Sequence, residues 1–377
     1  MRLATFNVEN MFERPSIMNL SSWKKGKSVL EDFTRLNDLI QKQIYSETDK
    51  QEMMKIMGLK RNEGLLELSQ KSEYMWLRVI RGKFIRRPKK GPKEIVANGR
   101  NDWIGWFELK NEPITEVAIE NTGRVIREVN ADVFCLVEVD DRIALKRFND
   151  TVIPNIKGKK YDHVMLIDGN DDRGIDLGIM TKQWFEIESI VSHVDDPDEN
   201  NEEEKIFSRD CPEYKIKTPA GNVLLVLINH FKSKGYGIPK VSNSKRMRQA
   251  EKVKDIYNSR LKQGFDYIAI VGDLNDTPDS QPLEPLLGNQ VGLKDIMAHD
   301  KFVGDGRAGT YGDGYTKDKI DYILMSPKLA DKVIAGGIER RGVWGGRTGK
   351  LFPHFDEIES GKDAASDHAA VWVDLDV

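Results

Sequence analysis

Short runs of four to six apolar residues recur along the chain without the polar alternation of a strand that has one wet face. Such runs predict β-strands covered on both faces. Six of them meet Asn, Asp, Glu or His at one end. They are LATF before Asn7, VFCLV before Glu138, VLLVLI before Asn229 and His230, IAIVG before Asp273, KIDYILM with Asp321 near its start, and ASDHAAVWV with Asp367 and His368 near its start. One such end carries no information because turns are polar, but six indicate strand ends that converge on one polar cleft able to bind a metal.

The segment 14–112 has a different pattern. Apolar residues at positions 29, 33, 36, 40 and 44 follow a spacing of three and four residues, which predicts an amphipathic helix over 29–45. A second helix is expected over 47–57. Outside this segment the pattern is mostly strand-like, with an occasional helix such as 243–262. We therefore predict that 14–112 is a mainly helical insertion.

Charge sets the same segment apart. The whole chain has a net charge of −3, but residues 14–112 contain 21 Lys and Arg against 13 Asp and Glu, a net charge of +8. The run RGKFIRRPKKGPK (81–93) has seven basic residues and no acid. Basic side chains that neutralise phosphates dominate the affinity of proteins for nucleic acid. We predict that this run binds substrate through Arg86, Arg87, Lys89 and Lys90, with a solvated surface as the alternative.

Tryptophans flank the basic run. Trp76, Trp103 and Trp106 lie on either side of it. Aromatic side chains beside basic ones suit the stacking of single-stranded nucleic acid. The same three residues could instead fill the core of the insertion, and both interpretations remain open.

Six motifs occur in a fixed order over residues 1–12 and roughly 115–377: TFNVEN, the acid of LVEV, NHFKSK, GDLND, KIDYIL and ASDH. In content and order they resemble the endonuclease/exonuclease/phosphatase superfamily, which has the deoxyribonuclease-I-like fold. The resemblance implies an α/β fold, a four-layer α/β/β/α sandwich of two mixed sheets, and metal-dependent phosphoester hydrolysis at one end of it. RGIDLGIM (173–180) is similar to a further strand of that family. We expect a single catalytic domain over 1–377, with 14–112 inserted after the first strand.

Hydrolysis of a phosphodiester needs neutralisation of the phosphate charge, an activated water molecule and help for the leaving oxygen. Glu138 and Asp367 offer hard oxygen donors suited to Mg²⁺ or Mn²⁺. Asn7 would orient a carboxylate or a metal-bound water molecule. We predict that these three residues form the metal site.

Five further residues are predicted to carry the catalysis. Asp273 is expected to activate the water molecule, and Asn275 on the same face to donate to phosphate. His230 and His368 are expected to donate to phosphate oxygens. In one interpretation drawn from the family, His368 shares the role of base and Asp321 orients it. The sequence does not separate the roles of Asp273 and His368.

The preferred function is a nuclease, with nucleic acid as the substrate. The alternative is a phosphatase or phosphodiesterase acting on a nucleotide, an inositol phosphate or a lipid headgroup, because one constellation serves all of these. A third alternative is an inactive family member that only binds nucleic acid. Arg173 is a candidate phosphate contact. For Glu9 and Arg209 we favour a structural use.

Several classes of protein are excluded by what the sequence lacks. No run of about 18 apolar residues exists, so we expect no membrane-spanning helix. The N-terminus has no secretory-signal pattern, and Cys135 and Cys211 cannot form a disulfide framework, so we expect a reducing, cytoplasmic compartment. The sequence has no Walker loop, nucleophile elbow or zinc-site spacing. No motif indicates a protein partner.

Overall fold

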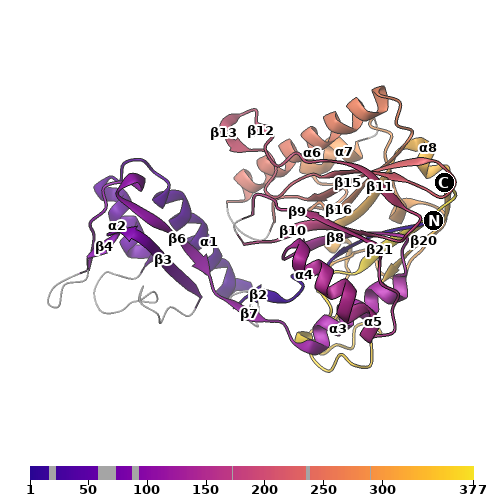
Figure 1. Cartoon of the computed structure of the whole chain (residues 1–377), viewed down its shortest axis with the longest axis horizontal. Coiled ribbons are helices and arrows are strands. Elements are labelled where there is room, and N and C mark those ends of the chain that lie inside the picture. The colour runs from indigo at the N-terminus through magenta and orange to yellow at the C-terminus, as the bar shows by residue number, and fades with distance from the viewer. Residues whose placement is uncertain (17–22, 58–73, 87–92, 172, 235–237, 289) are drawn as a thin grey trace. The chain divides into compact units, whose positions relative to one another are not determined.

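The computed structural model describes residues 1–16, 23–57, 74–86, 93–171, 173–234, 238–288 and 290–377. These residues form two compact units (Figure 1). The first unit contains Met1–Glu13, Ile114–Lys234 and Ile238–Val377. The second unit contains Arg14–Pro113 and so corresponds to the predicted insertion, with one more residue at its end.

The first unit is built on two mixed sheets, of which the larger has seven strands. Their order is β18-β20-β21-β1-β8-β10-β9. The strands are β18 (Phe302–Val303), β20 (Val333–Glu339), β21 (Ala370–Leu375), β1 (Arg2–Asn7), β8 (Val133–Val139), β10 (Asp176–Thr181) and β9 (His163–Ile167). Strand β1 lies in the middle, antiparallel to β21 and parallel to β8.

The second sheet has six strands in the order β11-β14-β15-β16-β19-β17. They are β11 (Glu186–Val191), β14 (Glu213–Lys217), β15 (Val223–His230), β16 (Tyr267–Asp273), β19 (Asp321–Met325) and β17 (Lys294–Asp295). β15 and β16 are parallel, and β19 is antiparallel to β16. The three strands that end in candidate catalytic residues are therefore direct neighbours.

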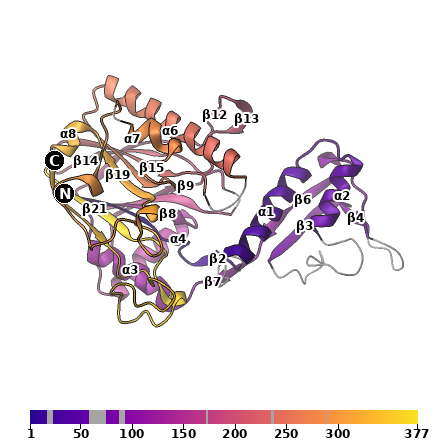
Figure 2. The ribbon, with the colours of Figure 1, turned by 180° about the vertical axis from the view of Figure 1, so that it is seen from behind.

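The two sheets pack face to face, with a layer of helices on each outer side. The core between the sheets contains Leu3 and Val133 from one sheet and Val226 and Val271 from the other. The outer face of the larger sheet packs on α3 (Glu116–Val129), and that of the smaller sheet on α6 (Pro239–Lys262). Figures 1 and 2 show the two helices on opposite sides of the strands. This arrangement confirms the predicted four-layer α/β/β/α sandwich.

The helices of this unit begin and end where local sequence allows. The Thr115 hydroxyl accepts a hydrogen bond from the Ala118 N–H at the start of α3, which ends at Asn130 in a left-handed conformation (φ 49°). α6 begins at Pro239, a residue with no N–H to leave unpaired, and so includes the predicted helix 243–262. The shorter elements are α4 (Arg142–Arg147), α5 (Ile153–Asn155), α7 (Glu284–Leu287), α8 (Pro327–Ala330) and the paired strands β12 (Pro197–Asp198) and β13 (Asn201–Lys205).

The second unit packs two helices against a two-stranded ribbon. Its elements are α1 (Trp23–Ile40), α2 (Glu47–Ile56), the ribbon of β3 (Met75–Gly82) and β6 (Trp103–Leu109), and the strand pairs β4 (Ile85–Arg86) with β5 (Glu94–Ile95) and β2 (Glu13–Pro15) with β7 (Asn111–Pro113). A core of its own includes Phe33, Leu36, Phe84, Trp103 and Phe107. Among the helices of both units, over the residues described, none has the length and apolar character needed to cross a bilayer.

The prediction of a mainly helical insertion is wrong for its second half. The two expected helices are present, although α1 ends at Ile40, whose carbonyl accepts a hydrogen bond from the Tyr45 hydroxyl. In the described residues after α2, strands and one 3₁₀ turn at Arg100–Asp102 replace the further α-helices that were expected. In β6 every second residue is buried and the others are more exposed, which is the period of a strand and not of a helix. Aromatic residues and isoleucine also favour strands.

Candidate active site

Strand alternation brings four predicted residues into the space between the sheets. Successive side chains of a strand point to opposite faces. Asn7, His230, Asp273 and Asp321 stand at even spacing from Leu3, Ile228, Val271 and Ile323, which all belong to the core between the sheets. The four polar residues therefore point the same way as that core, at the ends of their strands. All four are buried.

Three of these residues form one row across the smaller sheet. His230 of β15 pairs in register with Asp273 of β16, and Asp273 pairs in turn with Asp321 of β19. Neighbouring side chains in such a row lie on the same face and within reach of one another. The sequence motifs NH, GD and KID thus become one continuous line of titratable groups.

Glu138 joins the site through a β-bulge. The pairing of β8 with β10 shifts register beside Glu138, which has a left-handed backbone (φ 63°). The bulge breaks the alternation, since Val137 lies in the core between the sheets and Val139 in the core under α3. As a result, Glu138 Oε1 lies 3.3 Å from Asn7 Nδ2 and 3.6 Å from His230 Nε2.

Asn7 connects the two sheets at this point. Its Nδ2 donates to Glu138 Oε1 on its own sheet and to Asp273 Oδ2 on the facing sheet, each at 3.3 Å. Its Oδ1 accepts from the Glu9 N–H at 3.0 Å, and this bond fixes the orientation of the amide. The predicted role of Asn7 in orienting a carboxylate is consistent with these contacts.

His368 and Asp321 form a buried pair. His368 Nδ1 donates to Asp321 Oδ2 at 2.9 Å, and the Thr310 hydroxyl donates to the same oxygen at 2.6 Å. Burial lowers the pKa of His368, but the charge and hydrogen bond of Asp321 outweigh this and raise it well above its ordinary value. His368 therefore carries a proton at neutral pH. Its Nε2 faces Asp273 Oδ2, 3.9 Å away.

Asp273 lies at the centre of the site and resists ionisation. Burial and the charge of Asp321 raise its pKa to about 7, against the opposing effects of His368 and of the Asn275 N–H, which donates to Asp273 Oδ1 at 2.8 Å. A carboxyl group with this pKa exchanges protons near neutral pH. A cation bound nearby would lower the pKa again.

His230 has the opposite electrostatic environment. Burial, with the charges of Arg209 and Arg173, lowers its pKa well below the ordinary value. The imidazole is therefore neutral. Its Nε2 faces Glu138 and Asp273, while its Nδ1 is buried and has no hydrogen-bond partner among the described residues.

The two arginines beside His230 share one acid. Asp171 Oδ2 lies 2.8 Å from Arg173 Nη2 and 2.9 Å from Arg209 Nε. Arg209 is buried and donates to the Phe231 carbonyl, one residue after His230. Burial raises the pKa of Asp171, but the two guanidinium groups lower it overall. Both arginines therefore lie near enough to His230 to lower its pKa.

Asn275 lies beside Asp273, and its side-chain amide already forms one hydrogen bond. It has a left-handed backbone (φ 54°), and its Nδ2 donates to the Phe231 carbonyl at 3.1 Å. The next residue, Asp276, is buried and bonds Arg246 Nε of α6 at 3.0 Å. These contacts hold the loop after β16 against the loop after β15.

The loop before β21 is tied to β1. The Ser366 hydroxyl donates to the Asn7 carbonyl at 2.7 Å and accepts from the His368 N–H at 2.9 Å. The Asp367 N–H donates to Glu9 Oε2 at 3.1 Å. The sequence analysis did not identify Ser366 or Thr310, because neither residue stands directly at the end of an apolar run.

The donor set fits a divalent cation. Asp367 Oδ1 is buried and, within the described part of the chain, accepts no hydrogen bond, although His368 Nε2 lies 3.7 Å from it. A carboxylate oxygen is a donor suited to a divalent metal. Glu138 adds a second hard oxygen donor. Another group of possible ligands, Asp273, Asp321 and His368, has ligand atoms within 4.8 Å of one another. In it, however, Asp321 and His368 already bond each other.

The predicted basic residues of the insertion are only partly described. Arg86 is exposed and forms an ion pair with Glu94, its partner across the pairing of β4 and β5. The run 81–93 therefore meets an acid immediately beyond its end. Arg87, Lys89 and Lys90 lie outside the described residues.

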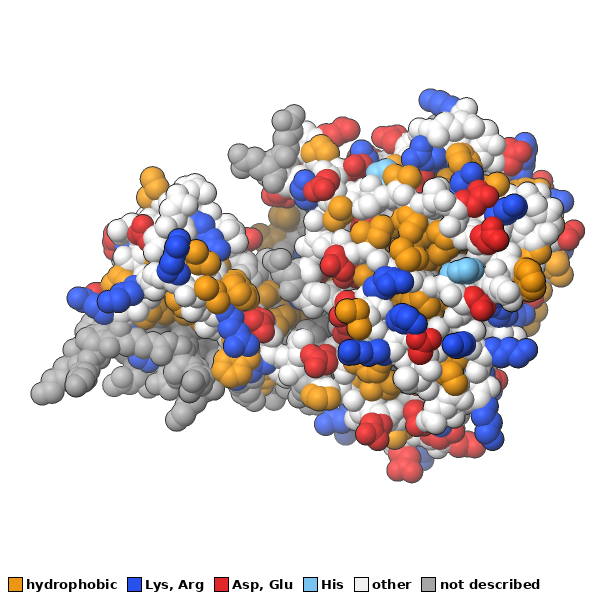
Figure 3. Space-filling model, viewed as in Figure 1, with side chains coloured by type: hydrophobic (Ala, Val, Ile, Leu, Met, Phe, Trp, Pro, Cys, Tyr) orange, Lys and Arg blue, Asp and Glu red, His pale blue; other side chains and the backbone are white. Residues whose placement is uncertain are grey.

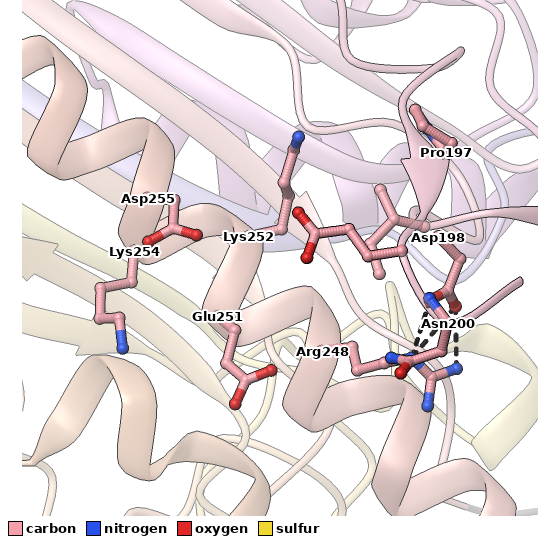
Figure 4. A pocket seen from close by; sticks show the side chains of 10 residues that line it. Pro197, Asp198, Asn200, Arg248, Glu251, Lys252, Lys254 and Asp255 are labelled. Atoms are coloured by element: carbon pink, nitrogen blue, oxygen red, sulfur yellow. Dashed lines mark hydrogen bonds and ion pairs between the residues drawn. The ribbon is translucent and has the colours of Figure 1, made fainter. Parts of the chain in front are cut away.

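A separate polar pocket of about 240 Å³ lies between β12 and α6 (Figure 4). Asp198 is fully buried there and accepts from Lys245 Nζ at 3.0 Å and from Arg248 Nη2 at 2.8 Å. Burial raises its pKa, but these partners lower it to about 2. The pairing joins the strand to the helix, and none of the candidate catalytic residues lines this pocket.

Comparison with known proteins identifies the family. Residues 84–329 match the model of the Endonuclease/Exonuclease/phosphatase family. None of the curated proteins matches the chain. Among solved structures, the chain is similar to an endonuclease/exonuclease/phosphatase family protein of Bacteroides thetaiotaomicron (17% identity, TM-score 0.48, covering 68% of this chain and 88% of that one). It is also similar to a mannosyl-6-phosphatase of the same organism (17%, 0.48, 69% and 92%) and to a truncated Caenorhabditis elegans TDP2 (17%, 0.46, 68% and 90%).

The family match spans about two thirds of the chain and includes four of the residues that meet at the candidate site, Glu138, His230, Asp273 and Asp321. The two mixed sheets with outer helices are the fold that the motifs implied. This chain belongs to the endonuclease/exonuclease/phosphatase family.

Proposed function

We propose that this protein is a divalent-metal-dependent phosphodiesterase that cleaves nucleic acid, with Mg²⁺ or Mn²⁺ as its cofactor. The observation that carries the proposal is the row of His230, Asp273 and Asp321, which Asn7 and Glu138 face from the other sheet. Family membership supports it, since enzymes of this family hydrolyse phosphoesters and typically depend on a divalent metal.

The cation is assigned to Glu138 and Asp367, with Asn7 holding the Glu138 carboxylate in position. When bound, it would neutralise charge on the phosphate and polarise its oxygens. Asp367 Oδ1 supports this assignment, because it accepts no hydrogen bond from the described residues. Glu9 would act indirectly: its carboxylate accepts from the Asp367 N–H, and its own N–H donates to Asn7 Oδ1.

Asp273 and His368 are assigned separate roles in proton transfer. Asp273 accepts the proton of the attacking water molecule, because a bound cation would lower its pKa below the value of about 7 and leave the carboxylate ionised near neutral pH. His368 already carries a proton, because Asp321 stabilises the imidazolium. In this form it donates from Nε2 to a phosphate oxygen as negative charge develops there. Thr310 and Asp321 position it.

The remaining polar groups are assigned to the phosphate. His230 is neutral and offers a ring N–H without adding charge, which avoids repulsion from a metal ion. Asn275 Nδ2 keeps one hydrogen beyond its bond to Phe231. Arg173, which is paired with Asp171, supplies positive charge to the phosphate.

The choice of nucleic acid over a small phosphoester rests on the second unit. The segment 14–112 has a net charge of +8, which suits a polyanion and serves no purpose for a single phosphate group. The site itself would accept either substrate class.

A substrate panel tests this proposal. Plasmid DNA, a single-stranded oligonucleotide, RNA and a small phosphomonoester would be incubated with the protein in Mg²⁺, Mn²⁺ or EDTA. We expect cleavage of at least one nucleic acid with either metal and none in EDTA. Hydrolysis of the phosphomonoester alone would overturn the choice of nucleic acid, and full activity in EDTA would overturn the metal assignment.

A further inference from the structure

The ribbon of β3 and β6 has two faces of different character. Its antiparallel register pairs Met75 with Leu109 and Leu77 with Phe107 on the face that packs into the core of the second unit. Side chains at alternate positions lie on the opposite face, which we call the outer ribbon face. The register shifts at a bulge between Val79 and Arg81, and beyond the bulge Arg81 pairs with Ile104. The outer ribbon face carries Trp76, Arg78, Arg81, Ile104, Trp106 and Glu108.

The outer ribbon face exposes large apolar side chains. The exposed fraction is 44% for Trp106 and 42% for Ile104, and 66% for Ile80, the unpaired residue of the bulge. In Figure 3, hydrophobic and basic side chains gather side by side over the strands of this unit. A cluster of exposed apolar groups bordered by charge marks an interaction surface.

The aromatic rings on this face are bordered and oriented by charged groups. Lys110 Nζ lies 4.0 Å and the Arg78 guanidinium 5.3 Å from the ring centroid of Trp76. The Trp106 ring N–H donates to Glu108 Oε2 at 3.3 Å, and Glu108 also pairs with Arg78. The Trp76 ring thus lies beside two cations, and the Trp106 ring is oriented by Glu108, which itself pairs with Arg78. Trp103, in contrast, is buried.

We propose that the outer ribbon face binds single-stranded nucleic acid, an inference that rests on the proposed function and names its substrate class. Unpaired bases stack on exposed aromatic rings, and neighbouring cations neutralise the phosphates. Exposed Arg81 near the end of β3 and exposed Lys83 directly after it extend the positive charge, within a segment of net charge +8. A duplex hides the faces of its bases, so stacking selects an unpaired strand.

Binding of an oligothymidylate of about 20 nucleotides, followed by fluorescence anisotropy in EDTA, tests this inference without cleavage. We expect Trp106→Ala to raise Kd about tenfold, the usual scale for loss of one stacked base. This factor should stay constant as salt rises. The weakening caused by Arg81→Gln with Lys83→Gln should instead shrink with salt, because it arises from counterion release.

Trp184→Ala is the matched control, since Trp184 is a tryptophan of the first unit with an exposed fraction of 68%. It should leave Kd unchanged. A wild-type Kd for Trp106→Ala, or no binding of the oligonucleotide by the wild-type protein, would overturn the inference. Hydrolysis of a small phosphodiester with Mn²⁺ should be equal in all variants. Its absence from the wild type would refute the proposed function instead, and the binding result would still stand.

Discussion

At the scale of single residues, the site depends on one hydrogen bond that sets the charge of His368. Asp321 Oδ2 accepts it, and the same oxygen accepts the Thr310 hydroxyl, so the carboxylate is held in one orientation. The imidazolium is therefore available to donate to a phosphate oxygen over the neutral pH range. Asp273 lies next to this pair. The roles of proton acceptor for Asp273 and proton donor for His368 therefore follow from the surroundings of each group and not from its residue type.

Asp321→Asn tests this arrangement. Asp321 raises the pKa of His368, so its removal should lower that pKa toward the ordinary value. Activity that needs protonated His368 would then be lost at a lower pH, and the basic limb of the profile of kcat/KM against pH should move down. We expect a loss of about 10- to 100-fold at neutral pH. An unshifted basic limb would contradict the role of His368 as a donor.

His193 couples stability to pH far from the catalytic row. Its Nε2 lies 2.9 Å from Glu213 Oε1 and its Nδ1 lies 3.0 Å from Asp196 Oδ2. Burial lowers the pKa of His193, but these carboxylates raise it overall above 6.5. The charged form therefore stabilises the fold fully below about pH 6.5, and this contribution is lost as pH rises through the folded-state pKa. His193→Gln should lower Tm more at about pH 6 than at about pH 9, and equal losses at both would contradict this.

At the scale of elements, the close approach of β15 and β16 aligns the row. Gly272 pairs with Asn229 and has a φ of +120°, and a Cβ there would lie 2.1 Å from the Asn229 carbonyl oxygen. Gly221 also has a positive φ, of +82°, but a Cβ there would meet nothing within 4 Å.

The two glycines form a matched pair of substitutions. Gly221→Ala should cost only the backbone strain of about 1–2 kcal/mol. Gly272→Ala should cost this strain and also separate the two strands, so its Tm should fall well below that of Gly221→Ala, with loss of activity. Thermal unfolding of both variants measures the difference. Similar Tm values for the two variants would mean that the close contact between β15 and β16 at Gly272 is not needed to align His230 with Asp273.

The elements of the sandwich could be predicted because their strands are buried on both faces. An apolar run that stops at His230 or Asp273 has few alternatives to a buried strand that ends at a polar edge. The ribbon of the second unit could not be recognised so readily. Its strand Trp103–Leu109 has apolar residues on both faces, so the alternation that separates strand from helix is hidden until burial is known.

The site was less predictable than the fold. Strand-end residues were found because each adjoins an apolar run. Thr310 lies in a glycine-rich loop, and Ser366 acts through the backbone, so neither has a local signal. The bulge at Glu138 depends on pairing with a distant strand. Arg209 is buried only because Asp171, which lies 38 positions earlier, balances its charge.

At the scale of the whole molecule, the two units differ in charge, and we assign binding of the polyanionic substrate to the second unit. Replacing Arg86, Arg87, Lys89 and Lys90 together with Gln should weaken binding of a long nucleic acid and flatten the dependence of log Kd on log salt. Turnover of a small phosphodiester should not change, because its single phosphate group needs no extended basic surface. Salt titrations of binding measure the slope, and an unchanged slope would show that the run is only a solvated surface.

The central claim is that the row of His230, Asp273 and Asp321, with a metal at Glu138 and Asp367, hydrolyses phosphodiesters. The most direct measurement is kcat for a small phosphodiester with Mn²⁺, compared between the wild type and Asp273→Asn, which keeps the shape of the side chain. We predict a loss of about 100-fold or more at an unchanged Tm. A kcat within a few-fold of the wild type, in a variant with the wild-type Tm, would contradict the account.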